Sequence, residues 1–246
     1  MAGLGFSMQQ NLIFAVHGFL GEGHDWFSCE KHLQTNWVKP SLFSQVSPTI
    51  DNFEIYISTL VQSHSFSNGN QLKKVFVGYS LGGRLGLHLL KNQSHLFDHF
   101  IFVSTNPGLS DEKDKVKRLE SDAQWAKVLD NDTWDSFLKL WNSQDVFDQH
   151  GLQPSRYEKD FDKKKLSGSF KNWSLGLQAD FRELIKAHSQ KITWVVGTKD
   201  SKFLAIAEDM KQKKILLDYS RINSGHRVLF ENPNELSKLI QNCFKY

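Results

Sequence analysis

The sequence contains only two cysteines, Cys29 and Cys243, which lie near opposite ends of the chain. They form neither a metal-binding spacing nor a redox motif, so a cysteine-based metal or redox centre is excluded. Two isolated thiols fit a reducing compartment. No metal and no other cofactor is expected.

The sequence also lacks long hydrophobic runs. No stretch approaches the roughly 20 apolar residues that a membrane helix needs. The opening residues, MAGLGFSMQQN, show no basic segment, apolar run or cleavage site of a secretory signal. We expect a cytoplasmic protein without a membrane span, present as a monomer or a weak oligomer.

Neither sign of charge is in large excess, since the formal net charge is only +3. The densest basic run, Lys163 to Lys165, lies among Glu158, Asp160 and Asp162. This pattern indicates a solvated helix end and not a nucleic-acid patch, so no nucleic-acid partner is expected.

Short apolar runs alternate with amphipathic stretches, a pattern typical of a mostly parallel sheet flanked by helices, the α/β class. At 246 residues, the chain fits a single domain over 1–246. The expected strands are 12–17, 74–79, 100–104, 192–196 and, less clearly marked, 215–219. The expected helices are 81–91, 201–213 and 232–244, the last with Pro233 in its first turn.

The region from about 106 to 180 interrupts this alternation. It is charged, mostly helical in pattern, and carries four tryptophans, at 125, 134, 141 and 173. We interpret it as a helical cap inserted after a central strand, with most of its tryptophans packing the cap onto the core.

The segment GYSLG (78–82) matches the G-x-S-x-G nucleophile elbow, in which a strained strand-to-helix turn projects a serine into a cleft. The pattern alone is weak. Here, however, it follows an apolar strand run and opens a glycine-punctuated helix, which is the context the motif requires. Ser80 is therefore the candidate nucleophile.

A serine hydroxyl needs an imidazole to accept its proton, and this fold supplies the acid and the histidine later in the chain. Asp200 follows the run ITWVVG, where it is also a candidate helix N-cap. His226 follows a glycine between the last strand pattern and the final helix. These residues complete a predicted Ser80–Asp200–His226 triad.

Two backbone N–H groups are needed for an oxyanion hole, one after the nucleophile and one after the first strand. We assign these to Leu81 and to Phe19 in the glycine-rich stretch HGFLG (17–21). His17 is interpreted as a structural anchor of that loop.

With these motifs in place, the chain resembles the 2-succinyl-6-hydroxy-2,4-cyclohexadiene-1-carboxylate (SHCHC) synthases of menaquinone biosynthesis, within the α/β-hydrolase superfamily. The resemblance covers most of the chain and includes HGFLGEGHDW (17–26), GTKDSKF (197–203) and GHRVLFENP (225–233). Two features are more discriminating: the arginine directly after GYSLGG, and NPGL (106–109) followed by RLESDAQWA (118–126).

The resemblance implies a lyase that eliminates pyruvate from a cyclohexene polycarboxylate by abstracting a proton beside a carbonyl. Arg84 and Arg118 are then candidate carboxylate clamps, because guanidinium binds carboxylate bidentately. A surface position is the competing interpretation for both arginines. Tyr79 and Trp141 resemble pocket-lining positions, with core packing as their alternative.

The chain departs from the family pattern in places. Leu229 stands where a second histidine is usual, and SPTID (47–51) replaces a PDLPGHG-like stretch. A third clamp is not evident, although Arg156 or one of the lysines 163–165 could take that place. The alternative functions are a serine carboxylesterase or thioesterase acting on a small or acyl-carrier-linked ester, and a catalytically silent binding module.

Overall fold

The structure of the protein is a computed structural model, which describes residues 11–64, 73–147 and 152–245. No targeting signal is expected in the amino-terminal segment, and its residues 1–10 lie outside the described residues. Within the described residues, no helix is both long and apolar enough to cross a bilayer.

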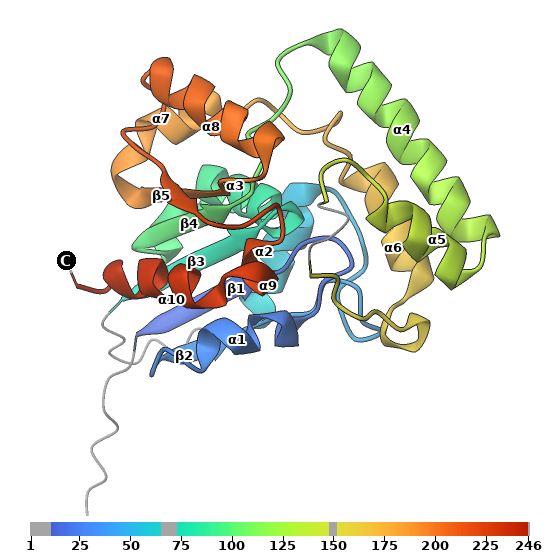
Figure 1. Ribbon diagram of the computed structural model, residues 1–246, viewed down its shortest axis with the longest axis horizontal. Helices are drawn as coiled ribbons and strands as arrows, with labels where there is room; N and C mark the ends of the chain where they lie inside the picture. The colour runs from blue at the N-terminus through green and yellow to red at the C-terminus, as the bar shows by residue number, and fades with distance from the viewer. Residues whose placement is uncertain (1–10, 65–72, 148–151, 246) are drawn as a thin grey trace, which may run out of the picture.

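A six-stranded sheet forms the centre of the fold, in the order β2-β1-β3-β4-β5-β6, and every neighbouring pair is parallel (Figure 1). The α/β class predicted from the sequence is confirmed. The strands are β1 (Leu12–Val16), β2 (Asn36–Val38), β3 (Lys74–Tyr79), β4 (His99–Val103), β5 (Ile192–Gly197) and β6 (Ser220–Ile222).

The strand expected at 215–219 is wrong, because the last strand begins at Ser220. The N–H groups of Ile215 and Leu216 both donate to the Met210 carbonyl, and Lys214 has a positive φ of 56°. These apolar residues therefore close the carboxyl end of helix α8 (Ser201–Gln212). Their burial explains the apolar run without any strand pairing.

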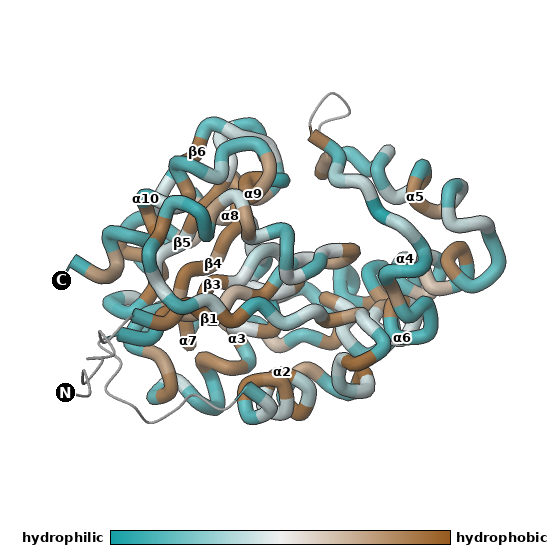
Figure 2. Tube along the Cα trace, turned by 90° about the horizontal axis from the view of Figure 1, so that it is seen from below, coloured by the Kyte–Doolittle hydropathy of each residue, from teal (hydrophilic) through white to brown (hydrophobic). Residues whose placement is uncertain are grey.

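Alternate residues of each strand enter two separate cores, as the period of two in a strand requires. On one face, Ile13 and Val75 pack with the short helices α1 (Phe27–Glu30) and α9 (Val228–Glu231) and with α10 (Pro233–Asn242). The other face packs against α2 (Phe53–Ser63), α3 (Leu81–Gln93) and α8. Figure 2 shows hydrophobic residues concentrated in the central strands between these layers.

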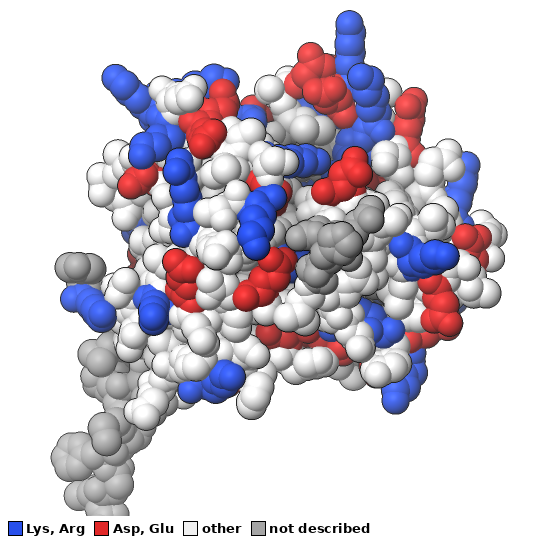
Figure 3. All heavy atoms as spheres, in the orientation of Figure 1, with Lys and Arg blue, Asp and Glu red and all other residues white. Residues whose placement is uncertain are grey.

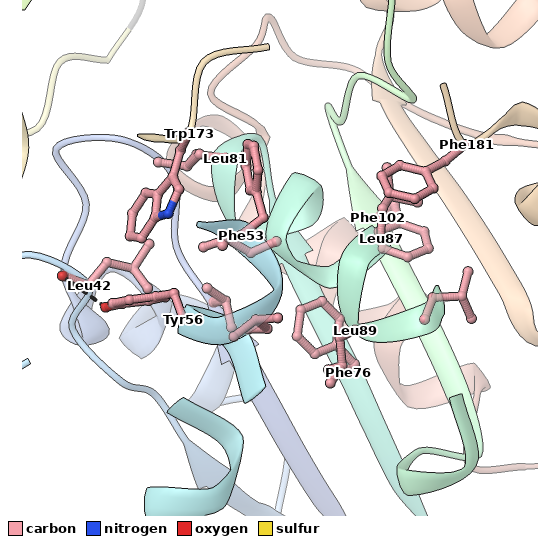
Figure 4. Packing of buried hydrophobic residues seen from close by; sticks show 14 of the residues in the cluster. Leu42, Phe53, Tyr56, Phe76, Leu81, Leu87, Leu89, Phe102, Trp173 and Phe181 are labelled. Atoms are coloured by element: carbon pink, nitrogen blue, oxygen red, sulfur yellow. Dashed lines mark hydrogen bonds between the residues drawn. The ribbon is translucent and has the colours of Figure 1, made fainter. Parts of the chain in front are cut away.

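Phenylalanines dominate the second core, where Phe76 lies within 6.4 Å, centroid to centroid, of Phe14, Phe97, Phe100 and Phe102. Helix α3 approaches this cluster closely because Gly86 has no side chain: a Cβ there would lie 2.2 Å from the Phe76 ring. Figure 4 shows Phe76, Leu87 and Leu89 packed between the strands and α3. This contact fixes the helix that begins at the nucleophile elbow.

The segment after β4 carries α4 (Glu112–Asn131), α5 (Trp134–Asn142) and α6 (Lys163–Asn172), and the chain returns to the sheet through α7 (Arg182–Ala187). Helices α4, α5 and α6 lie together to one side of the sheet (Figure 1). The remaining short 3-10 turns are Gly23–Trp26, Ser94–Leu96, Glu158–Asp160 and Ser189–Lys191.

Basic and acidic side chains are interspersed on the face shown in Figure 3. The run expected to be a solvated helix end begins α6, where Lys163 pairs with Glu158 at 3.3 Å and Lys164 is exposed. Lys165 instead contacts the loop before α2, where its Nζ donates to the backbone carbonyls of Ser44 and Ser47.

Candidate active site

Ser80 lies in a strained turn between β3 and α3, with φ 51° and ψ −108°. A non-glycine residue adopts a positive φ rarely and at a cost, which is typical of functional sites. The turn needs small neighbours: a Cβ on Gly82 would lie 2.2 Å from the Val16 carbonyl oxygen, and one on Gly78 would lie 2.6 Å from the Cα of Gly83. The glycines of the motif therefore permit the first turn of α3 to pack closely against the end of β1.

The structure brings the three predicted triad residues together. His226 Nε2 lies 3.2 Å from Ser80 Oγ, and His226 Nδ1 lies 2.7 Å from Asp200 Oδ2. Asp200 and His226 are buried, whereas Ser80 is half-buried. This order of contacts allows the imidazole to accept the hydroxyl proton while the carboxylate fixes its orientation.

Each triad residue is held by the end of a parallel strand. Asp200 follows β5, and its second oxygen, Oδ1, accepts from the Phe203 N–H at 3.3 Å as the N-cap of α8. His226 follows β6, and its ring packs on Phe203 with centroids 4.6 Å apart. The two interpretations of Asp200 are therefore compatible, since each uses a different oxygen.

The loop after β1 lies against the elbow, as an oxyanion hole requires. A Cβ on Gly18 would come within 3.4 Å of the Ser80 Cβ, so Phe19 follows directly after this contact. Leu81 is the first residue of α3, and its N–H therefore has no acceptor within the helix. Both amides are positioned near Ser80, where N–H groups could stabilise a developing oxyanion.

His17 holds this loop in place. Its Nε2 accepts from the Leu42 N–H at 3.0 Å, and its Nδ1 lies 2.8 Å from the Gly18 carbonyl oxygen, which it meets as the donor. The side chain is fully buried, and burial lowers the pKa of His17 to about 4. A neutral imidazole engaged at both nitrogens agrees with the anchoring role expected for it.

Two pockets meet at the nucleophile. We call them the Arg84 pocket, which also contains Arg118, and the Arg227 pocket, which also contains His226. Their volumes are about 650 and 550 Å³ with the solvent at their mouths included. Their linings share Phe19, Ser80 and Trp141.

Arg84 is buried, so it does not occupy the surface position that was considered as its alternative. Its Nε donates to Gln178 Oε1 at 2.7 Å and its Nη2 to the Trp173 carbonyl at 2.6 Å, both in the segment that returns from the inserted helices. Burial first, and then the charge of Arg118, lowers the pKa of Arg84 to about 9. Among the described residues, no carboxylate lies within ion-pair distance of this guanidinium, which stays protonated at neutral pH.

Arg118 also lines the Arg84 pocket, but it is half-buried and already paired. Its Nε lies 2.9 Å from both carboxylate oxygens of Asp122, one turn further along α4. Arg118 therefore combines features of both interpretations: it lines the pocket, as a substrate clamp would, and it forms an ion pair along its own helix, as a surface arginine would. Lys202, which the sequence analysis did not single out, lines the same pocket from an exposed position beside Asp200.

Tyr79 and Trp141 both line the site and both pack. Tyr79 lies in the Arg227 pocket with its ring 5.7 Å from His226, and burial raises the pKa of its phenol, which stays neutral. The Trp141 ring lies against Phe19, tilted by 48° with centroids 4.5 Å apart, and forms part of the wall between the two pockets.

Of the candidates for a third clamp, Arg156 reaches a pocket, whereas the lysines 163–165 line neither of the two pockets described. Arg156 lies in the Arg227 pocket, where its Nη1 and Nη2 donate to the two oxygens of Asp25 at 2.9 and 2.7 Å. In addition, Glu22 Oε2 lies 3.6 Å from Arg156 Nη1. Two carboxylates thus neutralise Arg156.

Sequence reasoning missed Arg227, a buried arginine in the Arg227 pocket. A signal was present, because this residue directly follows the triad histidine. It also missed Gln178 and the Trp173 carbonyl as the groups that orient Arg84. No sequence pattern connects them, since they lie about 90 positions away and meet Arg84 only through the fold.

No protein-family profile matches the chain, but individual proteins are similar to it. The chain is 29% identical over 233 residues to 2-succinyl-6-hydroxy-2,4-cyclohexadiene-1-carboxylate synthase of Enterobacter sp. (strain 638), covering 90% of this chain and 86% of that protein. It is 26% identical to the synthase of the same name from Salmonella typhimurium (strain LT2), covering 91% and 89%.

Solved structures support the fold. The structure of MenH from S. aureus superposes with a TM-score of 0.82 at 20% identity, covering 96% of this chain and 93% of that one. A thermophilic esterase from Thermogutta terrifontis gives a TM-score of 0.63 at 16% identity, covering 96% and 89%. Several synthases of one name therefore resemble this chain over nearly its full length, and its fold is that of the α/β hydrolases.

Proposed function

We propose that this protein is a carbon–oxygen lyase of menaquinone biosynthesis, which eliminates pyruvate from a succinyl-hydroxycyclohexene polycarboxylate by triad-dependent proton abstraction. One observation carries the proposal: Arg84, a buried guanidinium without a carboxylate partner among the described residues, lines the same pocket as Ser80. A buried unpaired cation costs free energy unless an anion joins it. A substrate carboxylate supplies that anion.

In the proposed mechanism, His226 accepts the hydroxyl proton of Ser80, and Oγ removes a proton from the substrate carbon beside a carbonyl. The resulting electron pair forms a carbon–carbon double bond as the carbon–oxygen bond to the pyruvate portion breaks. The protonated His226 then returns its proton to the departing enolate, which becomes pyruvate. The serine recovers its proton from the substrate, so both groups end in their starting states.

The charge that develops on the carbonyl oxygen during proton abstraction needs stabilisation. We assign this to the N–H groups of Phe19 and Leu81, which lie next to Ser80 on separate elements. Asp200 holds the imidazole in the tautomer that presents Nε2 to the serine. No covalent intermediate is required, which distinguishes this use of the triad from acyl transfer.

We also propose that residues 106–180 act as a cap that completes the pocket. Arg118, Trp141 and Phe170 reach the Arg84 pocket from α4, α5 and α6. Cys29 and Cys243 are both free thiols, which supports a reducing compartment such as the cytoplasm.

The test measures pyruvate release from the cyclohexene substrate with a lactate dehydrogenase coupled assay, beside hydrolysis of a neutral aryl ester on the same preparation. The lyase function predicts pyruvate formation by the wild type and its loss in Ser80→Ala. Brisk ester hydrolysis without any pyruvate would instead support the carboxylesterase alternative, which uses the same triad.

A further inference from the structure

Arg227 is a buried guanidinium with incomplete bonding. Only 6% of the residue is exposed, and its Nη2 donates to the side-chain oxygen of Asn142 in α5. Its Nη1 is buried and has no acceptor among the described residues. The ring of Phe147 covers the guanidinium, with its centroid 4.1 Å from Cζ. An arginine without a full set of acceptors is costly in such a place.

No neighbouring carboxylate among the described residues forms an ion pair with Arg227, and Glu231 acts on it only from beyond ion-pair distance. Within the described part of the chain, no carboxylate lies within 4.0 Å of its nitrogens. Glu231, four residues on, uses Oε2 to accept from the Gly225 N–H at 2.6 Å. Arg156 in the same pocket has Asp25 and Glu22 as partners, so Arg227 is the arginine of this pocket that has no ion-pair partner among the described residues.

The position of Arg227 relates it to the chemistry. It lines the pocket that contains Ser80 and His226, whereas Arg84 lies in the pocket beyond Phe19 and Trp141. A ligand that touches Ser80 can therefore extend into both pockets and present one carboxylate to each arginine. His226 contributes to the lining of the Arg227 pocket and not to that of the Arg84 pocket.

We propose that Arg227 binds the carboxylate of the departing 2-oxoacid portion of the substrate, while Arg84 binds a carboxylate of the ring portion. The proposal rests on the proposed lyase function. A leaving group that takes its proton from His226 must lie on the side of the nucleophile that His226 faces, and Arg227 is the uncompensated cation on that side. After the carbon–oxygen bond breaks, Arg227 retains the small 2-oxoacid until it leaves the pocket.

The test uses pyruvate itself as the probe, titrated against the full-length protein and followed by ligand-observed NMR. Arg227→Gln removes the charge but can keep a donor toward Asn142, and Arg227→Lys keeps the charge without the bidentate fork. We expect pyruvate to bind at least about tenfold more weakly to Arg227→Gln, with partial recovery in Arg227→Lys. Arg221→Gln is the matched control, because Arg221 is exposed and contacts Tyr219 and Glu208 outside both pockets.

Arg84→Ala separates the two pockets. The proposal requires pyruvate to bind this variant within about threefold of its affinity for the wild type, and equal loss in Arg84→Ala and Arg227→Gln would overturn it. Unchanged pyruvate binding by Arg227→Gln would overturn it as well. Thermal unfolding of every variant identifies a damaged fold, in which case Arg227→Lys, which preserves the buried charge, decides the question.

Catalysis gives a second readout. With the cyclohexene substrate, inhibition by added pyruvate should weaken in Arg227→Gln and persist in Arg221→Gln. The failure of the proposed function is distinguishable, because it appears as no pyruvate formation by the wild type while the direct titration still reports on Arg227.

Discussion

Asp200 and His226 are joined by a hydrogen bond of 2.7 Å between Oδ2 and Nδ1, while the other oxygen of Asp200 caps helix α8 through the Phe203 N–H. The same carboxylate thus orients the imidazole and fixes the beginning of a helix. Movement of α8 would therefore be transmitted to the His226 imidazole. Substitutions at Asp200 are expected to affect both stability and activity.

Ser80→Ala should abolish pyruvate release and leave the fold intact. Alanine is small enough for the elbow, although the positive φ at this position remains strained for any residue with a Cβ. The coupled pyruvate assay and circular dichroism check the two expectations. Retention of more than a few per cent of wild-type activity would contradict the assignment of Ser80 as the proton-abstracting residue.

Asp200→Asn and His226→Ala should each lower kcat by about a thousand-fold or more, because the basicity and orientation of the imidazole depend on both groups. Asp200→Asn should keep the N-cap, because asparagine caps a helix about as well as aspartate, whereas Asp200→Ala should also lower the unfolding free energy by about 1 kcal/mol through the lost N-cap. Steady-state kinetics and urea unfolding measure the two effects. Combining either change with Ser80→Ala should add little, and multiplicative losses would show that the three residues do not act together.

Arg84→Ala should lower the ratio of pyruvate elimination to aryl-ester hydrolysis strongly, because only the first substrate carries a carboxylate to bind. Loss of a desolvated charged contact typically costs about 2–5 kcal/mol. Arg84→Lys should recover only part of the ratio, since lysine cannot donate to Gln178 and to the Trp173 carbonyl as a planar fork does. An unchanged ratio would mean that Arg84 supports the elbow and not the substrate.

The buried His17 predicts a stability that depends on pH. Its pKa is lowered by burial from 6.5 to about 4 in the folded protein, so below pH 6.5 the unfolded chain binds a proton that the folded chain rejects. The corresponding stability is present above pH 6.5 and is lost as the pH falls toward 4, by about 3 kcal/mol in all.

His17→Gln keeps an acceptor for the Leu42 N–H but cannot titrate. Urea unfolding near pH 7 and near pH 4.5 should show a smaller acid loss in this variant than in the wild type. His88, whose pKa burial also lowers to about 4, is present in both proteins and so cancels in the comparison. Equal losses in the two proteins would contradict the assignment.

The local patterns of the sequence were sufficient for the central strands and for choosing three side chains that the structure brings within hydrogen-bond distance of one another. Short apolar runs predicted β1, β3, β4 and β5 within one residue at either end, because a buried parallel strand needs such a run whatever its neighbours are. The run at 215–219 shows the limit of this reasoning. Ile215 and Leu216 are buried at the end of α8, and apolar character alone does not distinguish that position from strand pairing.

The edge strand β2 was missed for a related reason. Asn36–Val38 is three residues long and only partly buried, so it has no hydrophobic period to detect. In the site, Ser80, Asp200 and His226 follow from motif and chain order. Whether an arginine has an ion-pair partner does not follow from the sequence, because the partners of Arg84, Arg156 and Arg227 are distant residues that only the fold brings near them.

The ion pair between Asp25 and Arg156 has a consequence for protein engineering. Asp25 follows β1, while Arg156 belongs to the inserted segment 106–180, and both side chains are almost wholly buried. An exchange of this segment between homologues would separate the pair and strand one charge in the interior, at a cost of about 3–5 kcal/mol. A chimera that exchanges the segment should therefore carry the matching residue at position 25. The segment can be exchanged without loss of stability only together with the partner of its residue 156.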